Sequence, residues 1–343
     1  MSFLMGFRRI KMFETIYIEK ELLGHKTAQN LHQVFPKAEL KSIDSYTDIF
    51  GAYRKPYLQK RNRLNLFLAT KKGKLIKEAP DAYGLKGEAH YYFIHAFNCI
   101  YECEYCYLQG YFDSPDIVLF VNHEDILKEM EKTLDSCANQ NVWFHAGEFS
   151  DSLAMSHISG EIEAYHDFFK SHPKAKLELR TKSANTRSLL KLEPLDNRFT
   201  SFSLAPEWQT KDIEHKTASL KQRLSAMKKL IQAGHKVAVH FDPVVLHKDY
   251  LSHYKLLIEQ MSEYFPIEQI EYLSLGVVRY TKEVFKTTQE HYPESPIFAG
   301  ELVTSFDGKV RYPKPLRMSV LRNIESILIK SGLQKEKIYL CME

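Results

Sequence analysis

The chain has 343 residues, of which 44% are hydrophobic and 26% charged, enough to bury the core of one large α/β domain with appendages or of two domains. No apolar run approaches the roughly 20 residues that a membrane-spanning helix needs, so no membrane partner is expected. The formal net charge of +4 neither requires nor excludes a nucleic-acid partner, and the location of the charge matters more than its sum.

Residues 1–84 are predicted to form an N-terminal α/β module. Residues 15–18 are rich in strand-forming side chains, residues 22–34 follow a helical pattern, and residues 38–42 are predicted as a second strand. The segment 52–64 (AYRKPYLQKRNRL) then interleaves basic residues with two tyrosines. This pattern is typical of a nucleic-acid surface, but a solvated face of a helix or loop explains it equally well.

The next feature is the run CIYECEYC at 99–106, in which Cys99, Cys103 and Cys106 have the spacing C-x3-C-x2-C. Three closely spaced thiolates can bind three corners of a 4Fe–4S cluster, whereas iron–sulfur clusters usually have four cysteine ligands. The fourth iron is then open to another ligand. The ligand expected there is S-adenosylmethionine (SAM), which the reduced cluster cleaves to a radical. In this spacing the chain resembles the radical SAM superfamily.

Two other roles for these cysteines compete with a cluster. A zinc site normally has four ligands, and two cysteines with His95 would give it an irregular spacing. Disulfides need an oxidising compartment, yet five cysteines are an odd number, and Arg8, Arg9 and Lys11 interrupt the only apolar stretch at the start. We therefore expect a reduced protein located in the cytoplasm.

From residue 91 onward, strand and helix patterns alternate. The candidate strands are 91–96, 142–146, 176–181, 199–204, 236–241 and 269–275, and the helical patterns lie at about 123–138, 156–170, 184–191, 217–233, 249–264 and 281–291. In the clearest helix Ser219 and Gln222 form a capping-box pair, and Gly234 is a suitable stop. Six consecutive strand–helix units predict a parallel sheet, which right-handed crossovers curl toward a barrel.

The predicted architecture is therefore α/β: a partial (β/α)6 barrel over 85–305, like that of radical SAM enzymes, after the N-terminal module. A short C-terminal extension over 306–343 is expected to hold a β-hairpin at 308–315 and a helix, because glycine and proline punctuate that stretch.

Catalytic residues of βα barrels follow the strands, at the carboxyl end of the sheet. The polar residues at those positions here are Glu148, Ser150, Asp151, Lys182, Ser183, Glu207, His240, Asp242 and Arg279. Any one of them can instead be a helix N-cap or a solvated loop residue, and Asp151, Ser183 and Asp242 are the most open to that explanation. Their convergence on one mouth favours a functional site.

Short motifs over most of the chain, to about residue 320, resemble those of spore photoproduct lyase and its wider relatives, which are radical SAM enzymes associated with DNA repair. The motifs lie at 99–109, 144–151, 180–182, 202–204, 214–217, 223–224, 233–236 and 279–282. Together they are specific for the wider family rather than for the lyase itself.

The resemblance implies a cofactor site and two catalytic tyrosines. Cys99, Cys103 and Cys106 match the cluster ligands, and the residues expected to bind SAM are Glu148, Ser150, Asp151, Lys182, Ser203 and Arg279. Lys182 would pair with the SAM carboxylate, which suits a compact ammonium. Tyr105 would lie against the adenine, and Tyr107 matches a tyrosine that relays a hydrogen atom.

Glu148 marks a departure from the lyase. In the lyase, a cysteine after the second barrel strand donates a hydrogen atom to the product radical, and alignment of Phe144 and Ser150 places Glu148 there. A carboxylate cannot do this because its O–H bond is too strong. Glu148 instead resembles the last residue of a Gly-Gly-Glu element that holds the SAM ammonium. Cys137 continues an apolar helical stripe and is expected in the core, whereas the place of Cys341 is not predicted.

Three functions follow from these residues. The first is a DNA-repair lyase acting on a pyrimidine lesion, with a hydrogen relay through the tyrosines and an electron donor such as a flavodoxin or ferredoxin. The second is an enzyme of the same family acting on RNA, a nucleotide or a small molecule, because fold and cofactor do not fix the substrate. The third is a zinc-stabilised nucleic-acid-binding protein without catalytic activity.

A lesion in duplex DNA would have to leave the helix to reach the barrel mouth. Candidate phosphate contacts are residues 53–63, Lys309, Arg311, Lys314 and Arg317. The resemblance also places the segment 309–312 where the family meets SAM or DNA, and a hairpin carrying Tyr312 could wedge open a duplex.

Overall fold

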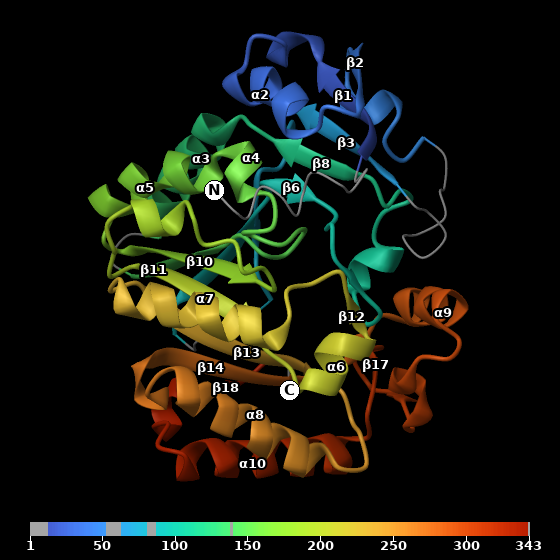
Figure 1. The fold of residues 1–343 in the computed structure, drawn as a ribbon, viewed down its shortest axis with the longest axis vertical. Helices are drawn as coiled ribbons and strands as arrows, with labels where there is room; N and C mark the ends of the chain where they lie inside the picture. The colour runs from blue at the N-terminus through green and yellow to red at the C-terminus, as the bar shows by residue number, and fades with distance from the viewer. Residues whose placement is uncertain (1–12, 53–62, 81–86, 138–139, 342–343) are drawn as a thin grey trace.

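The computed structural model describes residues 13–52, 63–80, 87–137 and 140–341 (Figure 1). Of the candidate nucleic-acid segment at 52–64, residues 53–62 lie outside the described residues.

The N-terminal part forms a five-stranded sheet in the order β2-β1-β3-β8-β6 (Figure 1). Its elements are β1 (Phe13–Glu19), α2 (Lys26–Val34), β2 (Glu39–Ile43), β3 (Leu64–Ala69), β6 (Ala96–Phe97) and β8 (Ile117–Phe120), with short helical turns η1 (Lys20–Leu22) and η2 (Tyr46–Asp48). The two predicted strands and the helix between them are confirmed. The domain boundary expected at residue 84 stays a prediction, and two strands of this sheet come from beyond it.

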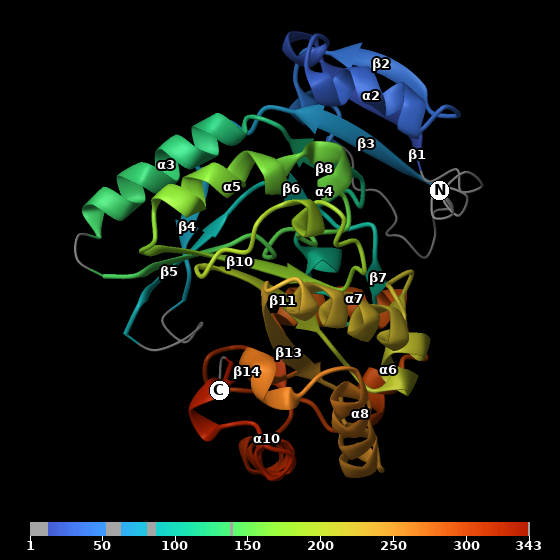
Figure 2. The ribbon, with the colours of Figure 1, turned by 60° about the vertical axis from the view of Figure 1, so that its left-hand side comes forward.

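The second sheet has eight strands in the order β18-β14-β13-β11-β10-β9-β5-β4. They are β4 (Ile76–Glu78), β5 (Ala89–Phe93), β9 (Val142–His145), β10 (Ala175–Thr181), β11 (Arg198–Ser203), β13 (Lys236–Val244), β14 (Ile270–Val277) and β18 (Ile338–Leu340). All neighbouring pairs are parallel except β4 with β5. The six central strands are the six predicted from sequence, and they curl into the expected partial barrel (Figure 2).

Helices cover the outer face of this sheet (Figures 1 and 2). They are α3 (His123–Ser136), α4 (Ser156–Ser159), α5 (Glu161–Ser171), α7 (Leu220–Gln232), α8 (Tyr250–Tyr264) and α10 (Lys314–Lys330). The capping box between Ser219 and Gln222 is present at the start of α7. The helix predicted over 184–191 is wrong: only the turn η5 (Leu189–Lys191) forms. The Asn185 main-chain N–H donates to the Ser183 hydroxyl (3.0 Å), a local bond that competes with helix formation.

The C-terminal extension contributes to both the mouth and the sheet. A small sheet contains β15 (Arg279–Tyr280), β16 (Val303–Thr304) and β17 (Val310–Arg311), and the region also holds α9 (Lys282–His291), η7 (Pro296–Ala299) and η8 (Lys335–Lys337). The short turn η6 (Ile267–Gln269) precedes β14 in the barrel. The expected hairpin exists, but its strands are β16 and β17, and residue 314 already begins α10. The chain then returns to the barrel as β18.

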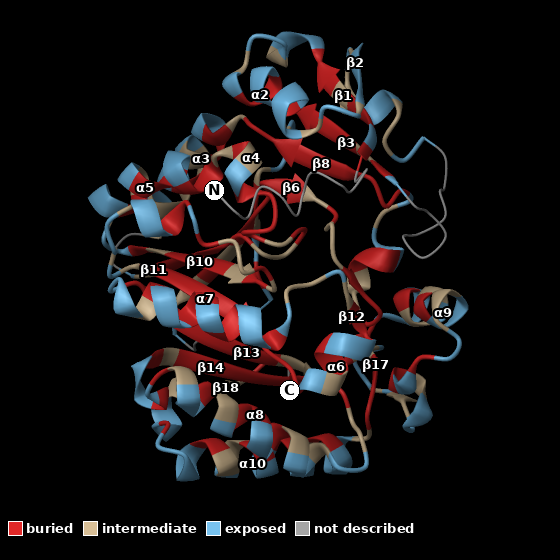
Figure 3. Ribbon diagram, in the orientation of Figure 1, coloured by how far each residue is buried: buried red, intermediate tan, exposed pale blue. Residues whose placement is uncertain are grey.

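Burial follows this layering (Figure 3). The barrel strands are buried almost throughout, whereas the covering helices bury only the face toward the sheet. In the part of the chain that the structure describes, none of the helices combines the length and the apolar character that crossing a membrane requires.

Candidate functional site

The three motif cysteines lie in one loop between β6 and the short helical turn η4 (Tyr107–Gly110). Within the loop, β7 (Glu102–Cys103) pairs in antiparallel fashion with β12 (Glu214–His215), which brings Cys103 opposite Glu214. The Cys106 main-chain N–H donates to the Cys103 carbonyl (3.0 Å), and the Tyr101 N–H points at the Cys99 sulfur (3.4 Å). Cys103 is buried and Cys99 and Cys106 are half-buried, so the loop keeps its thiols out of bulk water.

Burial keeps the three thiols of this loop protonated in the free protein. Burial raises the pKa of Cys103 to about 12 and raises the pKa values of Cys99 and Cys106, while Lys182 opposes this at Cys103 and Cys106. Because the thiolate is the form that binds a metal, a strong positive charge has to stabilise it, and iron supplies such a charge. The donor set therefore fits a 4Fe–4S cluster.

The zinc alternative loses its histidine ligand. His95 Nε2 hydrogen-bonds the Ala146 carbonyl (2.7 Å), and its Nδ1 faces Glu161 (3.4 Å). Both ring nitrogens therefore have partners away from the cysteine loop. Across the described ranges, no set of three or more His, Cys, Asp or Glu side chains surrounds a single-ion position. A cluster does not need one, since each of its cysteines binds a different iron.

A buried ion pair between Glu214 and Arg223 holds the cysteine loop in position. Glu214 accepts hydrogen bonds from the Tyr105 hydroxyl and from Arg223 (2.6 Å), and the Arg223 side chain is fully buried. Arg223 also donates to the Ser203 carbonyl (2.9 Å). The network thus connects α7, β11, β12 and the loop. Neither charged residue was assigned a role from sequence, although a charged Arg223 inside the apolar stripe of a helix was a signal that could have found it.

Lys182 lies between this ion pair and the cysteines. Its ammonium is 5.5 Å from the centroid of the Tyr105 ring, and among the described residues it has no hydrogen-bond or ion-pair partner. Burial alone would lower the pKa of Lys182, but the neighbouring Cys103 and Glu214 raise it, so the ammonium stays charged. A secluded, charged ammonium beside the cysteines suits an anionic ligand group.

The Asp151 carboxylate accepts hydrogen bonds mainly from neighbouring main-chain N–H groups and does not face an open cavity. Its carboxylate accepts from the Lys182 main-chain N–H (2.6 Å), from the Thr181 hydroxyl (2.7 Å) and from two N–H groups of the turn at 153–154. Four donors occupy it, in agreement with the capping explanation considered from sequence. Asp151 therefore fixes where Lys182 leaves β10, and its cofactor contact stays a prediction.

Glu148 and Tyr107 meet at the carboxyl end of β9. The Tyr107 hydroxyl donates to the Glu148 carbonyl. Burial raises the pKa of the Glu148 carboxyl, although Arg180 acts in the opposite direction. Gly147 is required here, because a Cβ on it would lie 2.7 Å from the Arg180 Cβ. Glu148 thus stands beside the tyrosine predicted to relay hydrogen.

Arg279 forms an ion pair with Asp242 that the sequence did not indicate. Its guanidinium donates to both Asp242 oxygens (2.8 and 3.1 Å) and approaches the Cys341 sulfur (3.7 Å). Burial raises the pKa of Asp242, but Arg279 outweighs it and lowers that pKa to about 2. Burial, reinforced by Asp242, raises the pKa of Cys341 to about 12. The fold therefore brings Cys341 to the barrel mouth as a protonated thiol.

Two of the predicted serines lie at the carboxyl ends of barrel strands. Ser150 and Ser203 are buried, after β9 and at the end of β11 respectively. For the side chains of these two described residues, the structure shows no hydrogen bond. Their binding of SAM stays a prediction.

The interior of the barrel holds a hydrogen-bonded chain that sequence reasoning missed apart from His240. His90 contacts His145 (3.0 Å), His145 contacts Glu178, and Glu178 contacts His240 Nε2 (2.7 Å), whose other nitrogen bonds Ser274. Five strands contribute one residue each. The available signal was polar side chains at alternate positions of strands that are otherwise apolar.

Several expected DNA contacts are corrected by burial. Arg311 and Arg317 are buried: Arg311 pairs with Asp307 (2.9 Å), and Arg317 donates to the Tyr312 carbonyl (3.2 Å). They are therefore not offered to a DNA backbone. Tyr312 is also buried, with its hydroxyl accepting from the Leu246 N–H (3.1 Å), so the expected tyrosine wedge is wrong.

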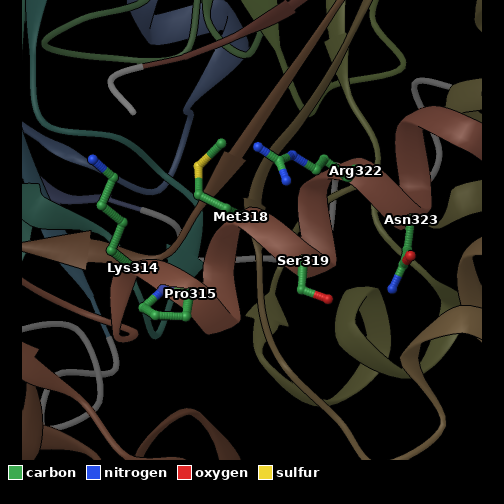
Figure 4. Close-up of a pocket in the computed structure, with 6 residues that line it drawn as sticks. All are labelled: Lys314, Pro315, Met318, Ser319, Arg322 and Asn323. Atoms are coloured by element: carbon green, nitrogen blue, oxygen red, sulfur yellow. The ribbon is translucent and has the colours of Figure 1, made fainter.

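A surface hollow of about 530 Å³ lies along α10 (Figure 4). It is lined by Lys314, Pro315, Met318, Ser319, Arg322 and Asn323. All six come from one outer helix, which Figure 2 shows well away from β7 and the cysteine loop. The hollow is thus separate from the candidate site, and of the expected phosphate contacts it includes only Lys314.

Comparison with known proteins bears on this arrangement. The family model described as spore photoproduct lyase matches residues 12–303. The chain is 24% identical over 289 residues to the spore photoproduct lyase of Bacillus subtilis (strain 168), covering 83% of each chain. It is 23% identical to that of Geobacillus sp. (strain Y412MC61), covering 82% of this chain and 83% of the relative.

Solved structures share the fold. A spore photoproduct lyase complexed with dinucleoside spore photoproduct has a TM-score of 0.79 at 18% identity, covering 97% of this chain and 99% of its own. A double mutant of spore photoproduct lyase with bound AdoMet and the same dinucleoside gives the same values.

Proposed function

This chain belongs to the spore photoproduct lyase family, and on that premise we propose that it is a radical SAM enzyme that repairs a pyrimidine photolesion in DNA. The related lyases are named for spore photoproduct, and two of the similar structures contain a dinucleoside form of it. The observation that carries the proposal is the grouping of three secluded cysteines with a charged, unengaged Lys182 in the part of the barrel mouth that the structure describes.

The chain's own residues divide the work of binding. Cys99, Cys103 and Cys106 would hold a 4Fe–4S cluster, and Lys182 would pair with the SAM carboxylate. Glu148 would hold the SAM ammonium, a favourable charge pairing in a site screened from water. When bound, cluster and SAM supply a 5′-deoxyadenosyl radical that abstracts hydrogen from the substrate.

Tyr107 is the better placed of the two tyrosines for relaying hydrogen. The Tyr105 hydroxyl is committed to Glu214 inside the protein, whereas the half-buried Tyr107 lies at the mouth beside Glu148. Tyr105 then keeps only the expected role against the adenine. An external protein such as a flavodoxin or ferredoxin as electron donor, and a cytoplasmic location, remain predictions.

A second candidate function rests on Glu148. This carboxylate is expected at the position of the lyase's hydrogen-donating cysteine, so the final quenching of the product radical would differ. That observation favours a family member acting on another substrate, such as RNA, a nucleotide or a small molecule.

One set of assays tests these proposals. Anaerobic reconstitution with iron and sulfide should give a brown protein that absorbs broadly near 400 nm, whereas a colourless protein with stoichiometric zinc would refute the radical chemistry. The reduced protein is then incubated with SAM and UV-irradiated DNA. Release of repaired thymine supports the first function, and deoxyadenosine formation without repair supports the second.

Two cysteine variants sharpen the reconstitution. Cys106→Ala should abolish cluster binding, measured as iron per chain. Cys137→Ala is the matched control, because Cys137 packs at the end of α3 and hydrogen-bonds Tyr91 (3.5 Å) outside the cysteine loop. Loss of SAM cleavage in a folded Cys137→Ala protein would contradict this assignment.

A further inference from the structure

Residues 71–77, KKGKLIK, run from the connection after β3 into the first two residues of β4 and form a segment that we name the lysine loop. Four of the seven are lysines and none is acidic. Within the described residues, Lys71, Lys72, Lys74 and Lys77 form no ion pair with a carboxylate. The loop is thus an uncompensated group of positive charges, and no motif in the sequence had pointed to it.

Sheet topology places the lysine loop at the barrel mouth. β4 pairs with β5 in antiparallel fashion, with Ile76 opposite Phe93, the last residue of β5. The parallel strands point their carboxyl ends at the mouth, so an antiparallel strand begins there. The residues before Ile76, including Lys72 and Lys74, therefore sit on the mouth side of the sheet, and both are exposed.

Aromatic rings connect this loop to the candidate site. The Lys77 ammonium lies 4.8 Å from the centroid of Phe149, which directly follows Glu148. The Phe149 ring is 5.4 Å from Tyr111, and Tyr111 is 5.8 Å from Tyr107. Tyr111 is 47% exposed, a high value for a large aromatic side chain beside a buried site. The four side chains form a continuous line from Lys77 to Tyr107.

The charges in the loop are held close together. Burial lowers the pKa of Lys71, and repulsion from Lys77 lowers it further. Lys71 also lies about the same distance from two rings, 5.9 Å from Phe97 and 6.0 Å from Phe120. Gathering like charges on an aromatic surface costs energy in the free protein, and a polyanion bound there relieves the repulsion.

We propose that the lysine loop and Tyr111 form the surface along which one DNA strand runs as its lesion enters the mouth. Lys72 and Lys74 contact backbone phosphates, and Tyr111 stacks on an unpaired base next to the lesion. Cationic side chains that follow the backbone beside exposed aromatic rings are the usual combination for single-stranded nucleic acid. This inference rests on the proposed function and deepens it, because it names the face that receives the strand.

The test measures affinity for a fluorescein-labelled, lesion-free single strand of 20 nucleotides by fluorescence anisotropy, over a range of salt concentrations. The double variant Lys72→Gln/Lys74→Gln should bind at least tenfold more weakly at low salt. Its plot of log affinity against log salt should be shallower by about 1.4, because each single-strand phosphate that a lysine neutralises adds about 0.7 to the slope. Tyr111→Ala should weaken binding about tenfold without changing the salt slope.

Lys221→Gln/Lys228→Gln, two exposed lysines on α7 that also lack ion pairs among the described residues, is the matched control and should bind like the parent. Melting temperatures verify that every variant is folded. Parent-like affinity and salt slope in the loop variants, equal losses in the control, or no DNA binding by the parent would each overturn this inference. Failure of the parent to cleave SAM would instead overturn the proposed function, so the two failures are distinguishable.

Discussion

Glu148 is the residue at which we expect this chain to differ chemically from the lyases. A carboxylate in a secluded site is costly while no cation faces it, and burial accordingly raises the pKa of Glu148 even though Arg180 is near. The Glu148 carboxylate therefore suits the binding of a ligand's ammonium better than it suits a purely structural role. A cost retained in the free protein is typical of a functional position.

Glu148→Gln should therefore stabilise the free protein while weakening SAM binding. The amide removes a half-buried charge, and we expect a gain on the order of 1 kcal/mol in the free energy of unfolding near pH 7.5. A raised carboxyl pKa means that the folded state binds the extra proton, so the gain should shrink as pH falls through the folded pKa and Glu148 becomes neutral. Urea unfolding and SAM titration measure both effects.

Glu207→Gln is the control for this substitution, because Glu207 also follows a barrel strand but is exposed. It should leave both quantities nearly unchanged. Unaltered SAM affinity in Glu148→Gln would remove Glu148 from the cofactor site.

At the scale of elements, the Glu214–Arg223 pair determines where the cysteine loop sits. α7 supplies the arginine and β12 the carboxylate, and the loop is attached through Tyr105 and through the pairing of β7 with β12. Burial raises the pKa of Glu214, yet Arg223 and Lys182 outweigh it and lower that pKa, so the carboxylate stays ionised. The loop depends on this charge pair for its position.

Arg223→Ala should destabilise the fold by about 3–5 kcal/mol, because it leaves the buried Glu214 carboxylate without its ion-pair partner, although the Tyr105 hydroxyl still donates to it. Iron per chain after reconstitution should fall as well. The comparison is Lys255→Ala, which removes an exposed pair with Glu259 (3.9 Å) on α8 and should cost less than about 1 kcal/mol. Denaturant titrations of both variants measure the difference, and equal costs would show that the buried pair is not an anchor.

The β16–β17 hairpin ends in an exposed apolar side chain. Phe306 lies in the turn between the strands and is 97% exposed, whereas the Tyr312 expected as a wedge is buried. An aromatic ring held fully in water has no stabilising role in the free protein, but it can insert between bases.

Phe306→Ala should leave the free energy of unfolding within about 0.5 kcal/mol of the parent. Repair of lesion-containing duplex DNA should slow several-fold, while turnover of a dinucleotide lesion, which needs no strand separation, should not change. Equal rates on the duplex for parent and variant would exclude the wedge.

For the whole molecule, local patterns predicted the sheet well but not the interactions between distant segments. Periodicity located all six central strands, because each is a separate apolar run between turns. No local pattern shows that β18 returns to the barrel and brings Cys341 close to Arg279. Nor does any show that Arg279 forms an ion pair with Asp242. The cysteine motif was readable because its ligands are adjacent in sequence, whereas Glu214 and Arg223 meet it only through tertiary pairing.

The same long-range packing buries several histidines in their neutral form. This predicts that the folded protein loses stability in acid. Burial lowers the pKa of His235 to about 4, helped by Arg198, and burial also lowers the pKa values of His240 and His123. The unfolded chain binds these protons below about pH 6.5 while the folded chain does not, so stability should fall as pH drops from there. His95, whose pKa Glu161 raises despite burial, acts in the opposite direction but is one residue against three.

Urea unfolding at pH 7.5, 6.5, 5.5 and 4.5 tests this expectation, with stability expected to decline steadily below pH 6.5. His235→Gln cannot take up the proton in either state. The slope of its unfolding free energy against pH should therefore be shallower than that of the parent, by the contribution of up to one proton taken up on unfolding. His32→Gln, at an exposed position on α2, should follow the parent. Parallel pH profiles for His235→Gln and the parent would show that His235 is not among the groups that make the fold acid-sensitive, and would shift that role to the histidines inside the barrel.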